Sequence, residues 1–313
     1  MTRQTATPPF LSYADYLTQK YGCRVYRVSV DAGFSCPNRG ENRTNPGCTF
    51  CHEQGSRAPY LDTATTIDEQ INGAIRFLQH RYHAEKFILY FQAFSNTNKP
   101  AAELKRLYDQ SLAFAPFVEL VVSTRPDCID REKTELLASY VTPAREVWVE
   151  LGLQTIHNKT LSRINRGHSA EDFFAAYHLL KQAGIKVAVH CIFGLPGEGK
   201  KEIEATIDTI AALKPDGIKL HNLHIPKDTP LFEEYLQGEI TVPSVHRYLD
   251  YTITTLTRIP KDTVILRLTT DTPQSERAAP LTFPVKAKFF ILLREQMAKQ
   301  KLFQGMYYKN NPE

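Results

Sequence analysis

Residues 24–51 read RVYRVSVDAGFSCPNRGENRTNPGCTFC. The first eight are rich in Val and Tyr alternating with polar residues, which predicts a short β-strand. Gly, Pro, Asn and Arg dominate the rest, as is typical of a loop, and this loop carries Cys36, Cys48 and Cys51. Because a disulfide would leave one of the three cysteines unpaired, the cluster indicates metal binding or catalysis.

The same strand signal recurs five more times, and amphipathic stretches separate the strands. Strands are predicted at 24–31, 86–94, 118–124, 146–153, 186–193 and 217–225. One helical stretch, SAEDFFAAYHLLKQAG, has Ser169 to cap its start and Gly184 just past its end. Repeated strand–helix units with mostly apolar strands predict parallel strands covered by helices. Six such units favour an α/β fold with an incomplete (β/α)6 TIM-like barrel, although a doubly wound sheet fits the same pattern.

We expect three segments along the chain. Residues 1–23 would form an N-terminal extension, residues 24–240 the partial barrel, and residues 241–313 an α-rich C-terminal appendage packed on the barrel. In barrels and doubly wound sheets alike, function gathers at the carboxyl ends of the strands. The cysteine loop directly follows the first strand, so it is expected at that end.

Composition limits the classes of protein that the chain can represent. The 313 residues are 42% hydrophobic and 23% charged, as in ordinary globular proteins. The N-terminal stretch has no apolar region typical of a secretory signal, and the longest apolar runs are too short to cross a bilayer. We therefore expect a cytoplasmic protein with reduced thiols and no membrane association.

A net charge of +4 permits a nucleic-acid partner without requiring one. Basic residues concentrate near the C-terminus, where aromatic residues are interleaved with them. The basic residues that could contact RNA are Lys286, Lys288, Arg294, Lys299 and Lys301. This pattern indicates either a packed amphipathic helix with a solvated basic face or a surface that contacts RNA.

The spacing C-x11-C-x2-C leaves two kinds of metal site open. Zinc would require a fourth ligand, for which His52 or His83 could be argued, and the chain would then be a zinc-bearing RNA-binding protein. However, His52 adjoins Cys51, and consecutive residues rarely close one tetrahedral site. An iron–sulfur cube takes four ligands, one per iron. Three cysteines would leave one iron free to bind a substrate or a cofactor.

Several blocks extend the pattern over nearly the whole chain: GCRVYRVSVDAGFSCPNRG, YFQAFSNT, STRPDC, ELGLQT, INRGHS, GLPGE, KLHNLHIPKDTPL and RLTTDTP. In this order they resemble the radical S-adenosylmethionine (SAM) enzymes of the Elp3-like group, specifically the bacterial YtqA/YhcC subgroup. The resemblance implies a [4Fe–4S] cluster on Cys36, Cys48 and Cys51, with SAM on the fourth iron. An electron from a donor such as flavodoxin or ferredoxin would cleave SAM, and the 5′-deoxyadenosyl radical would take a hydrogen from substrate.

The resemblance also implies SAM contacts at named positions. Gln92, Ser95 and Asn96 lie in QAFSNT, where related enzymes receive the amino group of SAM. Gln154 in ELGLQT matches a contact to the ribose. Arg166 in INRGH matches an arginine that pairs with the SAM carboxylate, a task that suits a planar guanidinium.

Other candidate residues have a structural alternative. Phe50 backs the cluster or adenine, or simply packs within the loop. His190 aligns with a polar residue near SAM, but a buried core histidine fits equally. The backbone from Ile192 to Pro196 would lie along the adenine, and Cys128 is placed to reach the site as a candidate catalytic residue. Weaker candidates for lining the site are Arg163, His168, His221 and His224.

The stretch GLPGEGKK (194–201) nearly matches a phosphate-binding loop. Lys201, however, takes the place of the hydroxyl residue that binds magnesium, and Glu198 would bring negative charge toward a phosphate. Nucleotide hydrolysis is therefore disfavoured. The resemblance implies instead a tRNA substrate, with conversion of the wobble-uridine C5 side chain from carboxymethylaminomethyl to aminomethyl. A protein or small-molecule substrate is the alternative.

Overall fold

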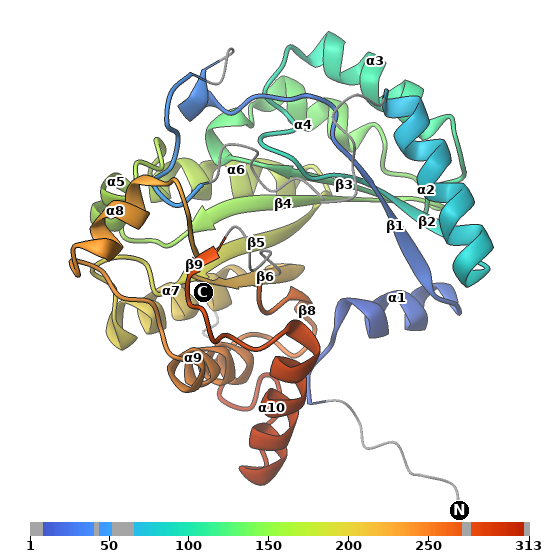
Figure 1. The fold of residues 1–313 in the computed structure, drawn as a ribbon. Helices are drawn as coiled ribbons and strands as arrows, with labels where there is room; N and C mark the ends of the chain where they lie inside the picture. The colour runs from blue at the N-terminus through green and yellow to red at the C-terminus, as the bar shows by residue number, and fades with distance from the viewer. Residues whose placement is uncertain (1–8, 41–43, 52–65, 271–276, 310–313) are drawn as a thin grey trace, which may run out of the picture.

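The computed structural model describes residues 9–40, 44–51, 66–270 and 277–309. Within them, seven parallel strands form one sheet in the order β1-β2-β3-β4-β5-β6-β8. The strands are β1 (Val25–Val30), β2 (Lys86–Phe91), β3 (Glu119–Thr124), β4 (Glu146–Gln154), β5 (Lys186–Phe193), β6 (Gly217–Asn222) and β8 (Val264–Arg267). The sheet curls into a half-barrel (Figure 1), which confirms the predicted incomplete barrel and excludes a doubly wound order.

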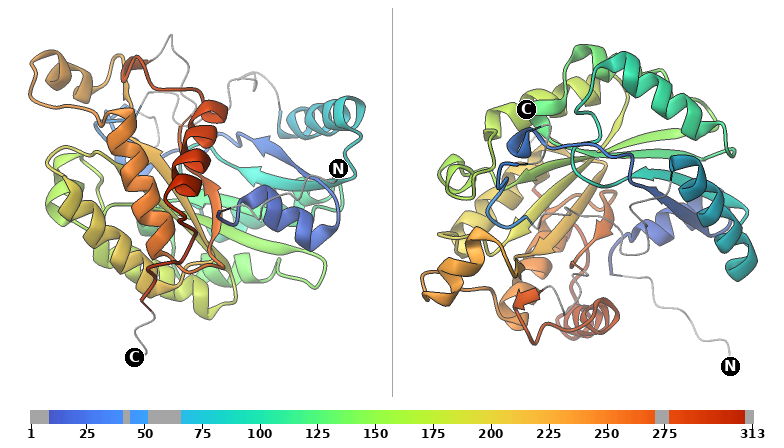
Figure 2. Two further views of the ribbon diagram at one scale, coloured as in Figure 1. Left: turned by 90° about the horizontal axis from the view of Figure 1, so that it is seen from below. Right: turned by 45° about the horizontal axis from the view of Figure 1, so that its top comes forward.

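Helices cover the convex face of this sheet (Figure 2). They are α2 (Ile67–Tyr82), α3 (Ala101–Leu112), α4 (Arg131–Ala138), α6 (Ala170–Gln182), α7 (Lys200–Leu213) and α9 (Val245–Arg258). Ser169 caps α6 as predicted, because its hydroxyl accepts a hydrogen bond from the Asp172 amide. None of the described helices is long and apolar enough to cross a membrane.

The structure differs from the sequence prediction at the end of the barrel. The strand predicted at 217–225 ends at Asn222, and β7 (Ile225–Pro226) instead pairs antiparallel with β9 (Arg277–Ala279). A seventh strand, β8, comes from beyond residue 240 and adds to β6. The last helix, α10 (Lys286–Lys299), buries Phe289 in the same core as the barrel strands. The predicted segment boundaries stay predictions.

The concave face of the sheet is closed at the amino ends of its strands by α1 (Tyr13–Tyr21), which lies between the two edge strands (Figure 1). Tyr13 and Leu17 of this helix pack with the inward-facing Trp148 in an apolar cluster. The Tyr13 hydroxyl donates a hydrogen bond to Glu119. In the described part of the chain, the interior is thus closed at the amino ends of the strands and opens toward their carboxyl ends, where the cysteine loop lies.

Candidate functional site

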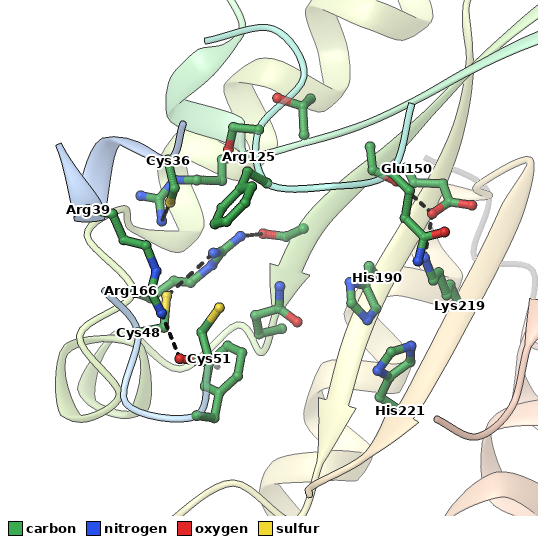
Figure 3. A pocket seen from close by; sticks show the side chains of 18 of the residues that line it. Cys36, Arg39, Cys48, Cys51, Arg125, Glu150, Arg166, His190, Lys219 and His221 are labelled. Atoms are coloured by element: carbon green, nitrogen blue, oxygen red, sulfur yellow. Dashed lines mark hydrogen bonds and ion pairs between the residues drawn. The ribbon is translucent and has the colours of Figure 1, made fainter. Parts of the chain in front are cut away.

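A pocket opens at the carboxyl ends of the strands, between the cysteine loop and the concave face of the sheet (Figure 3). It brings together most of the residues predicted from the sequence. Those that line it are Cys36, Cys48, Phe50, Cys51, Gln92, Ser95, Gln154, Arg166 and His190. Asn96, Ile192 and Cys128 do not line the pocket.

Asn38 ties the cysteine loop to the segment between α5 (Asn158–Arg163) and α6. Its side-chain amide donates hydrogen bonds to the backbone oxygens of Asn165 and Arg166, at 2.5 and 2.9 Å, and lies 3.5 Å from the Cys48 sulfur. A methyl group at Gly167 would stand only 2.1 Å from the Asn38 oxygen, and Gly167 has a φ of +74°. Only glycine therefore allows this close approach.

Guanidinium groups surround the three cysteines (Figure 3). Arg125 approaches the Cys36 sulfur at 3.9 Å, and Arg166 approaches the Cys48 sulfur at 3.7 Å. Arg39 donates a hydrogen bond to the Cys51 carbonyl at 2.7 Å. Hydrogen bonds and positive charge beside cysteine sulfurs tune the potential of an iron–sulfur cluster.

Zinc finds less support than a cluster. Among the described residues, no three His, Cys, Asp or Glu side chains are grouped so that they could hold one metal ion. An iron–sulfur cube does not need that convergence, because each thiolate binds a separate iron. His83 ends α2 and precedes β2, at the opposite end of the sheet from the cysteines, so it is not a ligand. His52 lies outside the described residues.

The carboxyl end of β4 holds Arg166 in the pocket. Arg166 Nη2 donates a hydrogen bond to the Gly152 carbonyl at 3.0 Å, and His168 Nε2 lies 3.1 Å from the same oxygen. Burial, with the positive charge of Arg166, lowers the pKa of His168 to about 4, so this imidazole is neutral at pH 7. His168 is thus a neighbour of Arg166 and does not line the pocket.

The backbone at this end of β4 is irregular. The pairing with β5 shifts between Gly152 and Gln154, and Gln154 has a φ of +76°. Such a bulge with a left-handed residue costs free energy and re-aims a side chain, which is common at functional sites. Gln154 Oε1 and Arg166 Nε are buried without a hydrogen-bond partner among the described residues. Both groups are therefore available to a polar ligand in the pocket.

Arg163, the alternative to Arg166, forms an ion pair with Glu234 on α8 (Pro230–Leu236). It donates two hydrogen bonds to that carboxylate, and its side chain is 43% exposed at the outside of the molecule. Asn96 also has a structural role, because its side-chain amide donates to the Ser123 carbonyl at 2.9 Å and its backbone carbonyl accepts from the Tyr108 hydroxyl. Only Arg166 of the two arginines faces the pocket.

Cys128 and Ile192 are buried beside the pocket. Burial, with the negative charge of Asp127, raises the pKa of the Cys128 thiol to about 12, so it is protonated at neutral pH. Ile192 packs in an apolar cluster with Ile164 and Leu195. His224 is buried beyond the end of β6 near Phe283 and is not in the pocket lining.

A buried ionic layer lies deeper in the barrel. Lys219 on β6 forms an ion pair with Glu150 on β4 at 2.5 Å, and the hydroxyls of Tyr90 and Ser123 donate to the same carboxylate at 2.7 and 2.9 Å. Burial alone would raise the pKa of Glu150, but Lys219 and Arg27 hold it below the usual range. Glu150 and Lys219 line the pocket, and neither was predicted from the sequence.

Two histidines face each other on the wall opposite the cysteines (Figure 3). The rings of His190 on β5 and His221 on β6 lie 4.5 Å apart. Burial, then nearby positive charge or the other imidazole, lowers the pKa of both rings well below the ordinary value. His190 Nε2 is buried without a partner among the described residues. Both rings are therefore neutral, and His190 Nε2 is available to form a hydrogen bond.

The loop that resembles a phosphate-binding loop is occupied by carboxylates. Glu198 accepts a hydrogen bond from the Thr155 hydroxyl at 2.6 Å. Glu202 accepts one from the Gly199 amide at 2.8 Å, at the start of α7. The Gly199 amide is thus used within the chain, and Glu198 is held by Thr155 at the place where a phosphate would lie.

Comparison with known proteins agrees with this geometry. A sequence profile of the Radical SAM superfamily matches residues 38–210, and one of the Radical_SAM C-terminal domain matches residues 215–299. YtqA of Bacillus subtilis is 32% identical over 95% of this chain and 92% of its own length. YhcC of Escherichia coli is 36% identical over 85% of this chain and 84% of its own length.

More distant matches come from the Elp3 group. A tRNA uridine(34) acetyltransferase of Methanocaldococcus infernus is 37% identical over 39% of this chain, which is 23% of that protein. The structure of Elp3 from the same organism superimposes with a TM-score of 0.70 and 20% identity, over 90% of this chain and 64% of that one. That structure shows the shared fold. The chain belongs to the radical SAM superfamily, among relatives of YtqA, YhcC and Elp3, and this family implies a [4Fe–4S] cluster and SAM.

Proposed function

We propose that Cys36, Cys48 and Cys51 hold a [4Fe–4S] cluster and that SAM occupies the fourth iron. The observation that carries the proposal is the pocket itself. Three cysteines from one loop meet buried polar atoms of Gln154 and Arg166 that have no partner among the described residues. Three thiolates, cationic neighbours and polar groups without partners fit a cluster with one site-differentiated iron and a zwitterionic ligand.

The side chains around the pocket divide the binding of SAM. Arg166 pairs with the carboxylate and Gln154 contacts the ribose, while Gln92 and Ser95 receive the amino group. The cluster held by Cys36, Cys48 and Cys51 would supply the electron for reductive cleavage of SAM. The protein positions this chemistry and shields it from water, because α1 and Trp148 close the far end of the barrel.

Phe50 and His190 line the same pocket. Phe50 lies between Cys48 and Cys51 in the chain, so its ring is placed to cover the cluster or the adenine. His190 is neutral and offers a ring nitrogen without a partner among the described residues. Ile192 contributes backbone only, along the adenine edge. Cys128 keeps no catalytic role in this proposal, because it lies outside the pocket lining.

We further propose that the substrate is tRNA and that the reaction converts carboxymethylaminomethyl to aminomethyl on the wobble uridine. Support comes from the relationship to a tRNA uridine(34) acetyltransferase and to Elp3. The reducing electron would come from a flavodoxin or ferredoxin. On α10, Phe289, Leu293 and Met297 are buried, while the basic residues Lys288 and Arg294 are exposed. The helix can therefore pack on the core and still present positive charge to RNA.

The test compares modified nucleosides in tRNA from cells with and without the protein. Cells without it should accumulate the carboxymethylaminomethyl nucleoside and lose nucleosides derived from the aminomethyl form. The wild-type gene should restore the pattern, and a Cys48→Ala variant should not. Unchanged tRNA nucleosides would reject the RNA substrate and favour a protein or small molecule, without affecting the assignment of the cluster.

A further inference from the structure

Arg267 reaches the pocket because the last strand of the sheet is irregular. On β8, Ile265 pairs with Ile218 of β6, and the next pair is Arg267 with Lys219. Leu266 is thereby an extra residue in the strand. Leu266 packs in the apolar cluster of the barrel interior, while its neighbour Arg267 lines the pocket. Consecutive residues of a regular strand face opposite sides, so the bulge is what brings Arg267 inward.

The pocket offers Arg267 no anionic partner among the described residues. Arg267 Nη1 lies 3.3 Å from His221 Nε2, and no ion pair involves Arg267 in the described part of the chain. Among the described residues that line the pocket, Glu150 is the single carboxylate, and it is paired with Lys219. Arg125 has Asp127, which accepts two hydrogen bonds at 2.8 Å. Arg267 is thus a partly buried cation beside a neutral imidazole.

Such a charge is costly to keep in a pocket unless a ligand compensates it. We propose that Arg267, with His221 and His190 beside it, binds a carboxylate of the substrate on the wall opposite the cysteine loop. A guanidinium matches a carboxylate with two parallel hydrogen bonds. The His190 ring lies 4.5 Å from the His221 ring, and its Nε2 atom, which has no partner among the described residues, adds a second polar group beside Arg267.

The position of Arg267 favours a carboxylate on the reacting end of the substrate over an RNA phosphate. Arg267 pairs in register with Lys219, which forms the buried ion pair with Glu150. This layer lies deeper in the barrel than the cysteine loop. A nucleic-acid backbone would meet cations on the outer surface instead. This inference rests on the proposed function, in which the carboxymethylaminomethyl group carries such a carboxylate.

The test measures binding by anaerobic calorimetry with SAM-loaded wild-type protein and with Arg267→Gln. The ligands are tRNA bearing carboxymethylaminomethyluridine, the same tRNA bearing aminomethyluridine, N-methylglycine and inorganic phosphate. Wild type should prefer the carboxylated tRNA by about 10- to 150-fold, the equivalent of one charge-assisted interaction. Arg267→Gln should bind both tRNAs equally and lose N-methylglycine. Its iron and sulfide content should match that of wild type, as expected if the fold and the cysteine loop are intact.

The outcomes separate this inference from the proposed function. Wild-type protein that binds N-methylglycine through Arg267 but ignores both tRNAs would reject the RNA substrate and keep the carboxylate site. An Arg267→Gln variant that still discriminates between the tRNAs would overturn the carboxylate site. Wild-type protein that does not bind N-methylglycine and does not prefer the carboxylated tRNA would also overturn the carboxylate site. Preferential binding of phosphate through Arg267 would assign the anion to RNA and also overturn the inference.

Discussion

Replacing Gly152 by Ala should disturb the SAM site while leaving the fold intact. A Cβ atom at this position would stand 2.6 Å from Arg166 Nη2 and 3.0 Å from the Gln154 side-chain nitrogen. Real Cβ contacts are essentially never shorter than 3.0 Å. Arg166 must therefore move, and it can do so cheaply because the clash involves the tip of a flexible side chain.

The movement costs Arg166 its hydrogen bond to the Gly152 carbonyl and its aim into the pocket. A hydrogen bond to a charged group contributes about 1.5–3 kcal/mol, so losing one such contact to SAM should weaken binding about 10- to 150-fold. The free energy of unfolding should change by less than about 1.5 kcal/mol, as for other tolerated small changes.

Calorimetry with SAM, beside iron and sulfide analysis, measures both effects. Gly73→Ala is the matched control, because Gly73 lies in α2 with no atom within 4 Å of an added Cβ. It should leave SAM affinity unchanged. If Gly152→Ala binds SAM as wild type does with a full cluster, Arg166 is not the SAM contact. If the cluster is lost as well, the effect passes through Cys48, which Arg166 also contacts.

Three further predictions follow from the ionic groups. Glu150→Gln should lower the free energy of unfolding by about 3–5 kcal/mol in urea titrations, because Lys219 keeps a buried charge without its partner; adding Lys219→Met should recover part of the loss. Burial, with the charge of Glu146, raises the pKa of Glu119 to about 7. The protonated Glu119 therefore contributes fully to stability below pH 4.5, and this contribution declines as pH rises through 7. Glu119→Gln should flatten that decline in thermal unfolding measured from pH 4.5 to 8. Neutralising Lys288 and Arg294 should reduce the slope of log tRNA affinity against log salt by about 1.4–1.8, and equal slopes would place RNA elsewhere.

The barrel could be predicted from the sequence because each strand is a short apolar run with its own helix, a local signal. The strand predicted to run to 225 was misjudged, since apolar Leu223 and Ile225 continue the pattern after the chain has left the sheet. The pairing of β7 with β9 and the addition of β8 depend on contacts between distant segments. Periodicity carries no information about such contacts.

The cysteines could be found because thiols in one loop are rare and their chemistry is specific. Glu150, Lys219 and Arg267 were not predicted. Their role depends on which side chains of separate strands point into the barrel and meet there. A signal did exist for two of them, since Glu150 and Lys219 are charged residues flanked by apolar residues within strands. Arg267 had none, because a bulge between β6 and β8 decides its direction.

Reductive cleavage of SAM by anaerobically reconstituted protein decides whether the three cysteines hold a radical SAM cluster. Wild-type protein should be brown, bind about four iron and four sulfide per chain, and form 5′-deoxyadenosine when reduced in the presence of SAM. Cys48→Ala should form none, while Cys23→Ala, altered before β1 at the opposite end of the sheet, should behave as wild type. A colourless wild-type protein that retains zinc, or a Cys48→Ala variant with full activity, would contradict the assignment.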